Sequence, residues 1–223
     1  MLTIGLIAEG SCDFVVLRFM LAGFLDDPDA AVNPLQPPQR ADGTYEIGGW
    51  TKVLAFCASE RIEDALKDNQ LLVVHIDTDD CDKPGFDVSR RKPSGEELTV
   101  EEMVIAVREK LISTIGKERY ARIGSRLVFA IAVESIECWL LPLYYTDTHA
   151  KKTINCINSL NHALGASERF TIDVHNKQHR YYEKVAKPYT KQKTLLGKAP
   201  RQPSCALFLN ALRATLDEPA PDE

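Results

Sequence analysis

Three short runs of almost uninterrupted apolar residues constrain the fold of this chain more than any other feature of its sequence. The runs are LTIGLIA at 2–8, LLVVHI at 71–76 and LVFAIAV at 127–133. Strands that are apolar on both faces are typical of parallel sheets that helices cover on both sides. We therefore predict an α/β fold with a mainly parallel sheet between two layers of helices.

Helical spacing of apolar residues fills most of the sequence between and after these runs. Ser11 is a candidate N-cap for the first helix, and Thr99 begins the pattern of a capping box. A stretch from 26 to 49 that is rich in Pro, Asp and Gly indicates a loop, with a short strand near 45–47. Pro142 should kink or end the helix in which it lies. The predicted helices cover residues 12–25, 50–69, 100–115, 137–145, 151–164 and 205–216.

The length of 223 residues suits one large α/β core with a small appendage. Apolar periodicity weakens beyond residue 146. We therefore predict a core over 1–147 and a smaller, basic, helical and loop region over 148–223 that packs on this core.

The sequence contains no apolar stretch near 18 residues, and no basic start followed by an apolar run and a cleavage site. We therefore expect a cytoplasmic protein without a membrane partner. Its six cysteines are scattered and include no CxxC pair. This pattern predicts reduced, mostly buried thiols and neither a disulfide framework nor a zinc site.

Carboxylates follow each of the three apolar runs. Glu9 comes after the first run, Asp77 after the second and Glu134 after the third. The stretch HIDTDDCD at 75–82 adds three more acids, Asp79, Asp80 and Asp82. Ligands of open α/β sheets bind outside the carboxyl ends of the strands, so we expect these acids to converge there. Crowded carboxylates cost folding energy unless a cation offsets the repulsion, and oxygen ligands suit Mg²⁺ or Mn²⁺.

Taken alone, the DTDD stretch is compatible with several chemistries. In metal-dependent glycosyltransferases a DxD motif holds a divalent ion, and a solvated turn explains the stretch equally well. Phosphatases of the haloacid-dehalogenase type carry their Asp pair after the first strand, whereas here it follows the second strong apolar run. An EF-hand loop is excluded because the required Gly and Glu positions are missing.

The acids taken together resemble a known pattern. Glu9-Gly10, Asp77-x-Asp79 and Glu134-x-x-Glu137 resemble the Toprim domain that topoisomerases, primases and a group of nucleases share. Longer stretches resemble the small Toprim-like proteins of bacterial defence loci, which are related to OLD-type nucleases. These stretches are GLIAEGSCDFVVLRFML, GGWTKVL, LLVVHIDTDD, AVESIECWLLP and PSCALFLNALRA.

The resemblance implies a Rossmann-like Toprim core that binds one or two Mg²⁺ or Mn²⁺ ions for phosphodiester chemistry. On this pattern the catalytic residues are Glu9, Asp77 and Asp79, which also hold metal. Glu134 and Glu137 match a signature that adds further carboxylates, although Glu137 is equally explained as an acid in the first turn of a helix. The pattern DxDx(D/E) is broken by Cys81, so Asp80 is a further candidate metal ligand.

The net charge of −5 hides an asymmetry. Residues 177–201 contain eight Lys or Arg and one acid, so this segment carries +7 and the remainder of the chain −12. A basic stripe beside an acidic centre suits a metal-using enzyme that acts on a polyanion, and it is also compatible with a solvated face. The candidate nucleic-acid-binding residues are Lys184, Lys187, Lys191, Lys193, Lys198 and Arg201.

The sequence thus favours a divalent-metal-dependent nuclease, or a nuclease-like effector, that acts on DNA or RNA, with anti-phage defence as a context. The first alternative is a non-catalytic Toprim-like subunit that works beside an ATPase. The chain lacks a GxxxxGK(S/T) loop, so any ATP-driven step would come from such a partner. The second alternative is a metal-dependent phosphatase of small molecules. A homo-oligomer is compatible with all three.

Overall fold

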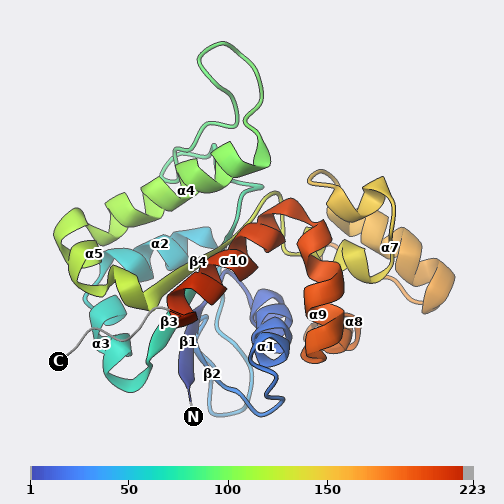
Figure 1. Ribbon diagram of the computed structural model, residues 1–223, viewed down its shortest axis with the longest axis horizontal. Coiled ribbons are helices and arrows are strands. Elements are labelled where there is room, and N and C mark those ends of the chain that lie inside the picture. The colour runs from blue at the N-terminus through green and yellow to red at the C-terminus, as the bar shows by residue number, and fades with distance from the viewer. Residues whose placement is uncertain (1, 218–223) are drawn as a thin grey trace.

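Four parallel strands form one sheet in the order β2-β1-β3-β4 (Figure 1). The computed structural model describes residues 2–217. The strands are β1 (Thr3–Ile7), β2 (Ala31–Gln36), β3 (Leu71–Asp77) and β4 (Leu127–Ala132). β1, β3 and β4 are the three apolar runs of the sequence. The predicted α/β fold with a parallel sheet is confirmed.

Ten α-helices and five short 3₁₀ turns surround the sheet in the described part of the chain. The helices are α1 (Ser11–Leu25), α2 (Trp50–Ala58), α3 (Arg61–Asp68), α4 (Val100–Ile115), α5 (Lys117–Ile123), α6 (Glu137–Leu140), α7 (Cys156–Ser167), α8 (His179–Ala186), α9 (Gln192–Lys198) and α10 (Pro203–Asp217). The 3₁₀ turns are η1 (Gly124–Arg126), η2 (Leu141–Leu143), η3 (Thr148–Lys151), η4 (Lys187–Thr190) and η5 (Ala199–Arg201). None of the described helices has both the length and the apolar character that a membrane span requires.

Alternate residues of each strand enter two different hydrophobic clusters, one on each face of the sheet. Leu6, Val73 and Ala130 pack on the face that α1, α8 and α10 cover. The strand neighbours of these residues, Ile7, Val74 and Ile131, pack on the face that α2, α3, α4 and α5 cover. Figure 1 shows the two helical layers on opposite sides of the strands. Burial of both faces explains why the strands are apolar without alternation.

The strand β2 was predicted as loop, and this prediction is wrong. Five of its six residues pair with β1, and Pro34 lies opposite Leu6 in the register. Proline cannot donate a hydrogen bond, so it is tolerated only where a strand lies at the edge of a sheet, as β2 does. The polar side chain of Asn33 donates to Asn69 Oδ1 at 2.8 Å. Because Asn33 and Pro34 interrupt the apolar residues of β2, this strand does not form an apolar run in the sequence.

Several predicted helix boundaries change in the structure. The helix predicted over 50–69 is two helices, because Ser59 adopts an extended backbone between α2 and α3. The N-cap of α1 is Gly10 and not Ser11. The capping box at Thr99 is confirmed, since its side chain accepts the N–H of the third helical residue. The helix α6 ends at Leu140 and continues as a 3₁₀ turn that contains a proline, as expected.

The C-terminal helices share the hydrophobic cluster of the sheet face that carries α1. Helices α8 and α9 and the turn η4 pack along α1, and α10 packs on β4 (Figure 1). The Tyr189 hydroxyl donates to the carbonyl of Trp139 at 2.7 Å. A Cβ at Gly23 would lie 1.9 Å from the carbonyl oxygen of Tyr189, so the close approach of η4 to the end of α1 requires glycine there. Residues on both sides of position 147 therefore build one core.

Candidate metal centre

The acidic residues predicted after β1 and β3 meet in one pocket at the carboxyl end of the sheet. These strands are parallel neighbours, so Glu9 after β1 lies beside Asp77 at the end of β3. The pocket has a volume of about 330 Å³. We call it the acidic pocket, and its charged lining consists of Glu9, Asp13, Asp77, Asp79 and Lys177.

Backbone groups hold two of these carboxylates in place. Glu9 Oε1 accepts the N–H of Asp77 at 2.8 Å, which ties the end of β1 to the end of β3. Asp13 Oδ2 accepts the N–H of Gly10 at 2.7 Å at the start of α1. A loop also closes on Glu9 from the other side, because the N–H of Gly49 donates to the Glu9 carbonyl at 2.7 Å. A Cβ at Gly48 would lie 1.7 Å from the same carbonyl oxygen, so this contact requires glycine.

All four carboxylates of the acidic pocket have raised pKa values. Burial, together with the charges of Asp77 and Asp13, raises the pKa of Glu9 from 4.5 to about 9. Burial is also the largest cause of the raised pKa of Asp13, of Asp77 and of Asp79. Neighbouring acids add to the shift of Asp77, while Lys177 opposes it. A bound metal ion would oppose these shifts, because its positive charge favours the ionised form of a carboxylate.

Lys177 brings a positive charge into the acidic pocket from the segment before α8. Its ammonium lies 2.7 Å from Oε1 of Glu137, a residue whose side chain is only 1% exposed. The hydroxyl of Tyr182 donates to the same carboxylate. Burial alone would raise the pKa of Glu137, but Lys177 and these hydrogen bonds lower it overall. Glu137 therefore serves as the buried anchor of Lys177 and does not line the acidic pocket, where the sequence predicted a metal ligand.

Asp80, also predicted as a metal ligand, is engaged outside the acidic pocket. Its carboxylate lies 2.7 Å from the ammonium of Lys83. The turn that carries it is held by Arg90, whose guanidinium donates to the carbonyl of Thr78 at 2.6 Å and to that of Asp79. These contacts fix the backbone of the turn and leave the side chain of Asp79 exposed at the rim of the pocket.

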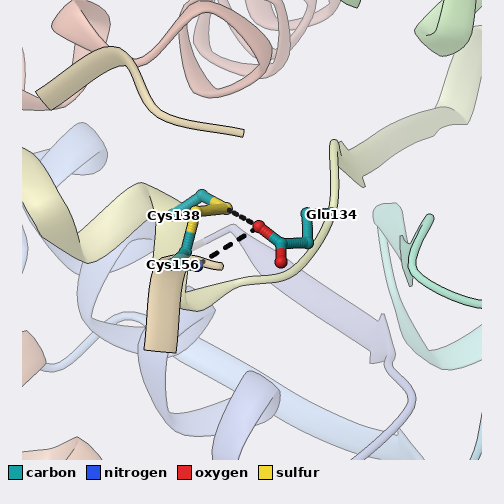
Figure 2. A group of neighbouring side chains, drawn as sticks. All are labelled: Glu134, Cys138 and Cys156. Atoms are coloured by element: carbon teal, nitrogen blue, oxygen red, sulfur yellow. Dashed lines mark hydrogen bonds between the residues drawn. A yellow bond between two sulfur atoms is a disulfide. The ribbon is translucent and has the colours of Figure 1, made fainter. Parts of the chain in front are cut away.

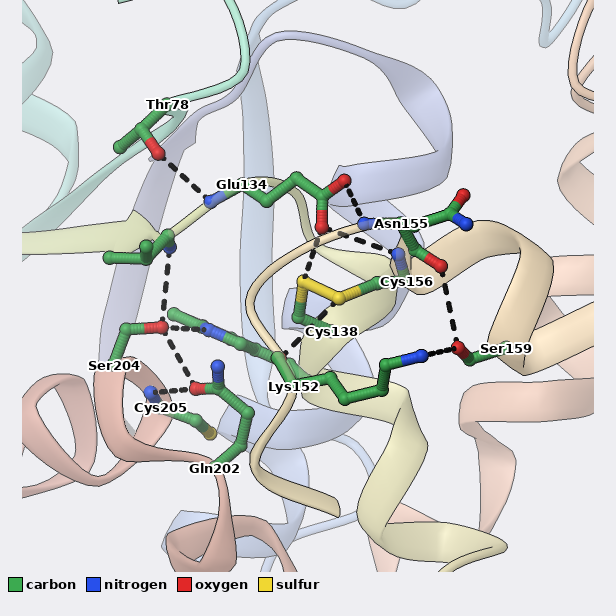
Figure 3. The surroundings of a disulfide bond; sticks show 12 residues. Thr78, Glu134, Cys138, Lys152, Asn155, Cys156, Ser159, Gln202, Ser204 and Cys205 are labelled. Atoms are coloured by element: carbon green, nitrogen blue, oxygen red, sulfur yellow. Dashed lines mark hydrogen bonds between the residues drawn. A yellow bond between two sulfur atoms is a disulfide. The ribbon is translucent and has the colours of Figure 1, made fainter. Parts of the chain in front are cut away.

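Glu134 was predicted as a metal ligand, and the structure places its carboxylate outside the lining of the acidic pocket. Its backbone supports the turn that follows β3, because its carbonyl accepts the N–H groups of Thr78 and Asp79, each at 3.0 Å. Its φ of 65° lies in the left-handed region, and its carboxylate is directed to the start of α7 (Figure 3). There it accepts the N–H of Asn155 and, at 3.2 Å, that of Cys156. A negative charge at a helix N-terminus is stabilised by the helix dipole.

A disulfide between Cys138 and Cys156 joins α6 to α7 beside this carboxylate (Figures 2 and 3). The prediction that all six cysteines are reduced is therefore wrong, although the other four are free and buried. Sulfur atoms that are bonded to each other carry no proton and do not act as thiolate ligands. The ligand atoms of Glu134 and of these two cysteines lie within 4.8 Å of one another, and the disulfide occupies both sulfur atoms.

The sequence analysis assigned no role to three residues of the site, Asp13, His75 and Lys177. The spacing of Asp13 and of His75 in the sequence could have indicated their positions. Asp13 follows Glu9 by four residues, which brings it to the first turn of the helix that begins beside Glu9. His75 lies two residues before Asp77 in β3, so both side chains point to the same face of the sheet. Lys177 is distant in sequence from both, and no spacing rule connects it to them.

The predicted nucleic-acid-binding residues lie away from the acidic pocket. Lys177 reaches the start of α1, whereas Gln192 beside Lys191 and Lys193 donates to the carbonyl of Phe24 at the end of this helix. A helix of 15 residues is about 22 Å long, so the two ends are well separated. Lys184 pairs with a glutamate at 2.9 Å, and Lys198 donates to a backbone carbonyl at 3.0 Å. The remaining predicted residues are exposed and make no ion pair within the described part of the chain: Lys187, Lys191, Lys193 and Arg201.

Comparison with protein families, with curated proteins and with solved structures finds no match to this chain.

Proposed function

We propose that this protein is a divalent-metal-dependent nuclease that cleaves phosphodiesters of DNA or RNA in the acidic pocket. The observation that carries the proposal is the convergence of four carboxylates with raised pKa values on one open pocket at the carboxyl ends of β1 and β3. Strongly shifted acids in a cleft are typical of functional sites. The resemblance of the same residues to the Toprim pattern agrees with this interpretation.

The donor set fits Mg²⁺ or Mn²⁺. Glu9, Asp77 and Asp79 supply carboxylate oxygen ligands at the strand ends. A divalent ion held there would polarise a phosphate and lower the pKa of a bound water. The hydrogen bond from Asp77 N–H to Glu9 fixes one carboxylate oxygen, which leaves the other free to face the pocket.

Lys177 gives the acidic pocket a means of receiving a phosphate group. It is the one cationic side chain in the described lining of the pocket. Its side chain is 41% exposed, and its ammonium pairs with buried Glu137. An ammonium fixed in this way neutralises charge that develops on a phosphate without having to reorganise. A volume of about 330 Å³ is at the small end of ligand pockets, which suits one phosphate of an extended polymer better than an enclosed metabolite.

The exposed basic residues of η4, α9 and η5 would hold the polymer at a distance from the reaction. Contacts from lysines to phosphates release counterions, so affinity should fall steeply with salt and depend little on sequence. The same contacts would remain when the acidic pocket is altered. Binding and cleavage are therefore separable by mutation.

The test compares cleavage of plasmid, single-stranded DNA and RNA by the wild type, by Asp79→Asn and by Asp82→Asn with Mn²⁺ or Mg²⁺. Asp79 lies at the rim of the acidic pocket and Asp82 lies outside it, and both are exposed, so neither change should disturb the core. We expect Asp79→Asn to lose at least about a hundredfold in cleavage rate with unchanged polymer affinity. Asp82→Asn should cleave at the wild-type rate.

Other results would redirect the assignment. Absence of cleavage on every polymer, with metal bound, would favour a non-catalytic subunit that acts beside an ATPase. Hydrolysis of a generic phosphomonoester without any cleavage of polymer would favour a phosphatase. Equal rates for Asp79→Asn and the wild type would remove the acidic pocket from the reaction.

A further inference from the structure

Asp13 and Asp77 of the acidic pocket form a second group of potential ligands with His75, a residue that the proposed function does not use. One ligand atom each of Asp13, His75 and Asp77 lies within 4.8 Å of the other two. All three residues are buried, and the side chain of His75 has no exposed surface. We call this group the inner site.

The inner site contains two buried polar atoms without hydrogen-bond partners in the described structure. These atoms are Nε2 of His75 and Oδ1 of Asp77, and they lie 3.2 Å apart. A buried polar group that lacks a partner destabilises the folded protein, so two adjacent ones indicate a ligand that satisfies both.

The other ring nitrogen of His75 determines what Nε2 can do. Nδ1 lies 2.7 Å from the carbonyl oxygen of Ala130, which can only accept, so the proton of the neutral ring is on Nδ1. Nε2 therefore carries a lone pair, and this atom lies 3.2 Å from Oδ1 of Asp77. A histidine that donates one ring N–H to a backbone carbonyl and offers the other nitrogen is the usual arrangement of a metal ligand.

The distances suit a metal ion. Two donor atoms that each bind one ion at about 2.0–2.2 Å lie about 3.0–3.5 Å apart when they occupy adjacent positions. The 3.2 Å between Nε2 and Oδ1 falls in this interval. Asp13 is held in place through its hydrogen bond to Gly10, which uses Oδ2 and leaves Oδ1 available.

We propose that Asp13, His75 and Asp77 form a second metal site that binds a first-row transition ion such as Mn²⁺ in preference to Mg²⁺. The nitrogen ligand is the reason for this preference, since imidazole suits transition ions and Mg²⁺ selects oxygen. Asp77 belongs to both sites, with Oδ1 directed at His75 and the rest of its carboxylate at the acidic pocket. The inference deepens the proposed function, because it places a selective ion next to the proposed catalytic one, but its test requires no cleavage.

The experiment is pulsed electron paramagnetic resonance of Mn²⁺ bound to the wild-type protein. A ¹⁴N modulation from the bound ion, changed by ¹⁵N labelling of histidine, is the expected result. Excess Mg²⁺ should leave the modulation in place. His75→Gln should abolish it and weaken Mn²⁺ binding at least about tenfold. Asp79→Asn and the exposed control His175→Gln should both retain it.

A second variant protects the test against a folding defect in His75→Gln. The chain has five histidines, and replacing the other four by glutamine leaves His75 alone. This variant should keep the full modulation. Mn²⁺ binding without any nitrogen coupling would overturn the inner site and leave the proposed nuclease intact. Nitrogen coupling without cleavage would support the inner site and count against the nuclease. Absence of Mn²⁺ binding would overturn both.

Discussion

Replacing Glu9 by glutamine should stabilise the metal-free protein at alkaline pH. Burial and the charges of Asp77 and Asp13 raise the pKa of Glu9 from 4.5 to about 9. The folded state thus keeps a proton that the unfolded state has released between these two pH values. Because the folded state binds more protons there, the free energy of unfolding falls as the pH rises from about 5 to 9.

The magnitude follows from the shift. One pKa unit corresponds to about 1.4 kcal/mol, so at pH 8 the difference from 4.5 gives an upper limit of about 5 kcal/mol. Relaxation around the charged group and water at the pocket reduce this, and we expect Glu9→Gln to gain about 2–4 kcal/mol at pH 8 and less than about 1 kcal/mol at pH 5. Glutamine keeps the oxygen that accepts the N–H of Asp77.

Urea unfolding in EDTA at pH 5, 6.5 and 8 measures this difference for the wild type, for Glu9→Gln and for the control Glu109→Gln. Glu109 is exposed in the middle of α4 and forms no ion pair with a described residue, so its replacement should have little effect at any pH. Addition of Mn²⁺ should make the wild type more stable than Glu9→Gln at pH 8, because the ionised carboxylate of Glu9 then binds the metal ion. A Glu9→Gln protein that is less stable than the wild type at pH 8 in EDTA would refute the reasoning.

Three further predictions concern the surroundings of the site. Lys177→Met should lower the free energy of unfolding at pH 7 by about 1–3 kcal/mol in urea titrations, and adding Glu137→Gln should restore most of it, since the buried charge is then gone. Gly48→Ala should cost about 1–3 kcal/mol, because the new Cβ would overlap the carbonyl of Glu9, whereas Gly165→Ala in α7 meets open space and should not destabilise. Thiol titration in denaturant should count four thiols before reduction and six after it; six before reduction would contradict the disulfide.

The parts of the fold that local sequence determines were predictable. Apolar runs identify β1, β3 and β4 because both faces of these strands are buried. The positions of Glu9, Asp77 and Asp79 follow from the strand ends, and the structure brings these three together as expected. The strand β2 was not predicted, because Pro34 and its polar neighbours do not form an apolar run and are tolerated only in a strand at the edge of the sheet.

The parts that depend on tertiary contacts were not predictable. The side chain of Glu134 follows a left-handed backbone that its hydrogen bonds to Thr78 and Asp79 stabilise, and no local rule indicates this. Lys177 enters the acidic pocket because buried Glu137 attracts its ammonium, a pairing that only the packing of the α8 region against the sheet creates. The sequence pattern predicts which residues lie at the ends of the strands. The direction of each side chain depends on its tertiary contacts, which the pattern does not predict.

The central claim is that the acidic pocket binds a divalent cation, and Mn²⁺ calorimetry tests it most directly. The proteins to compare are the wild type, the double variant Asp77→Asn with Asp79→Asn, and a matched double control, Asp82→Asn with Asp87→Asn, in which two exposed acids of the same loop are changed. We predict micromolar binding in the wild type and in the control, and its loss in the pocket variant. Absence of binding in the wild type, or equal binding in all three proteins, would contradict the account.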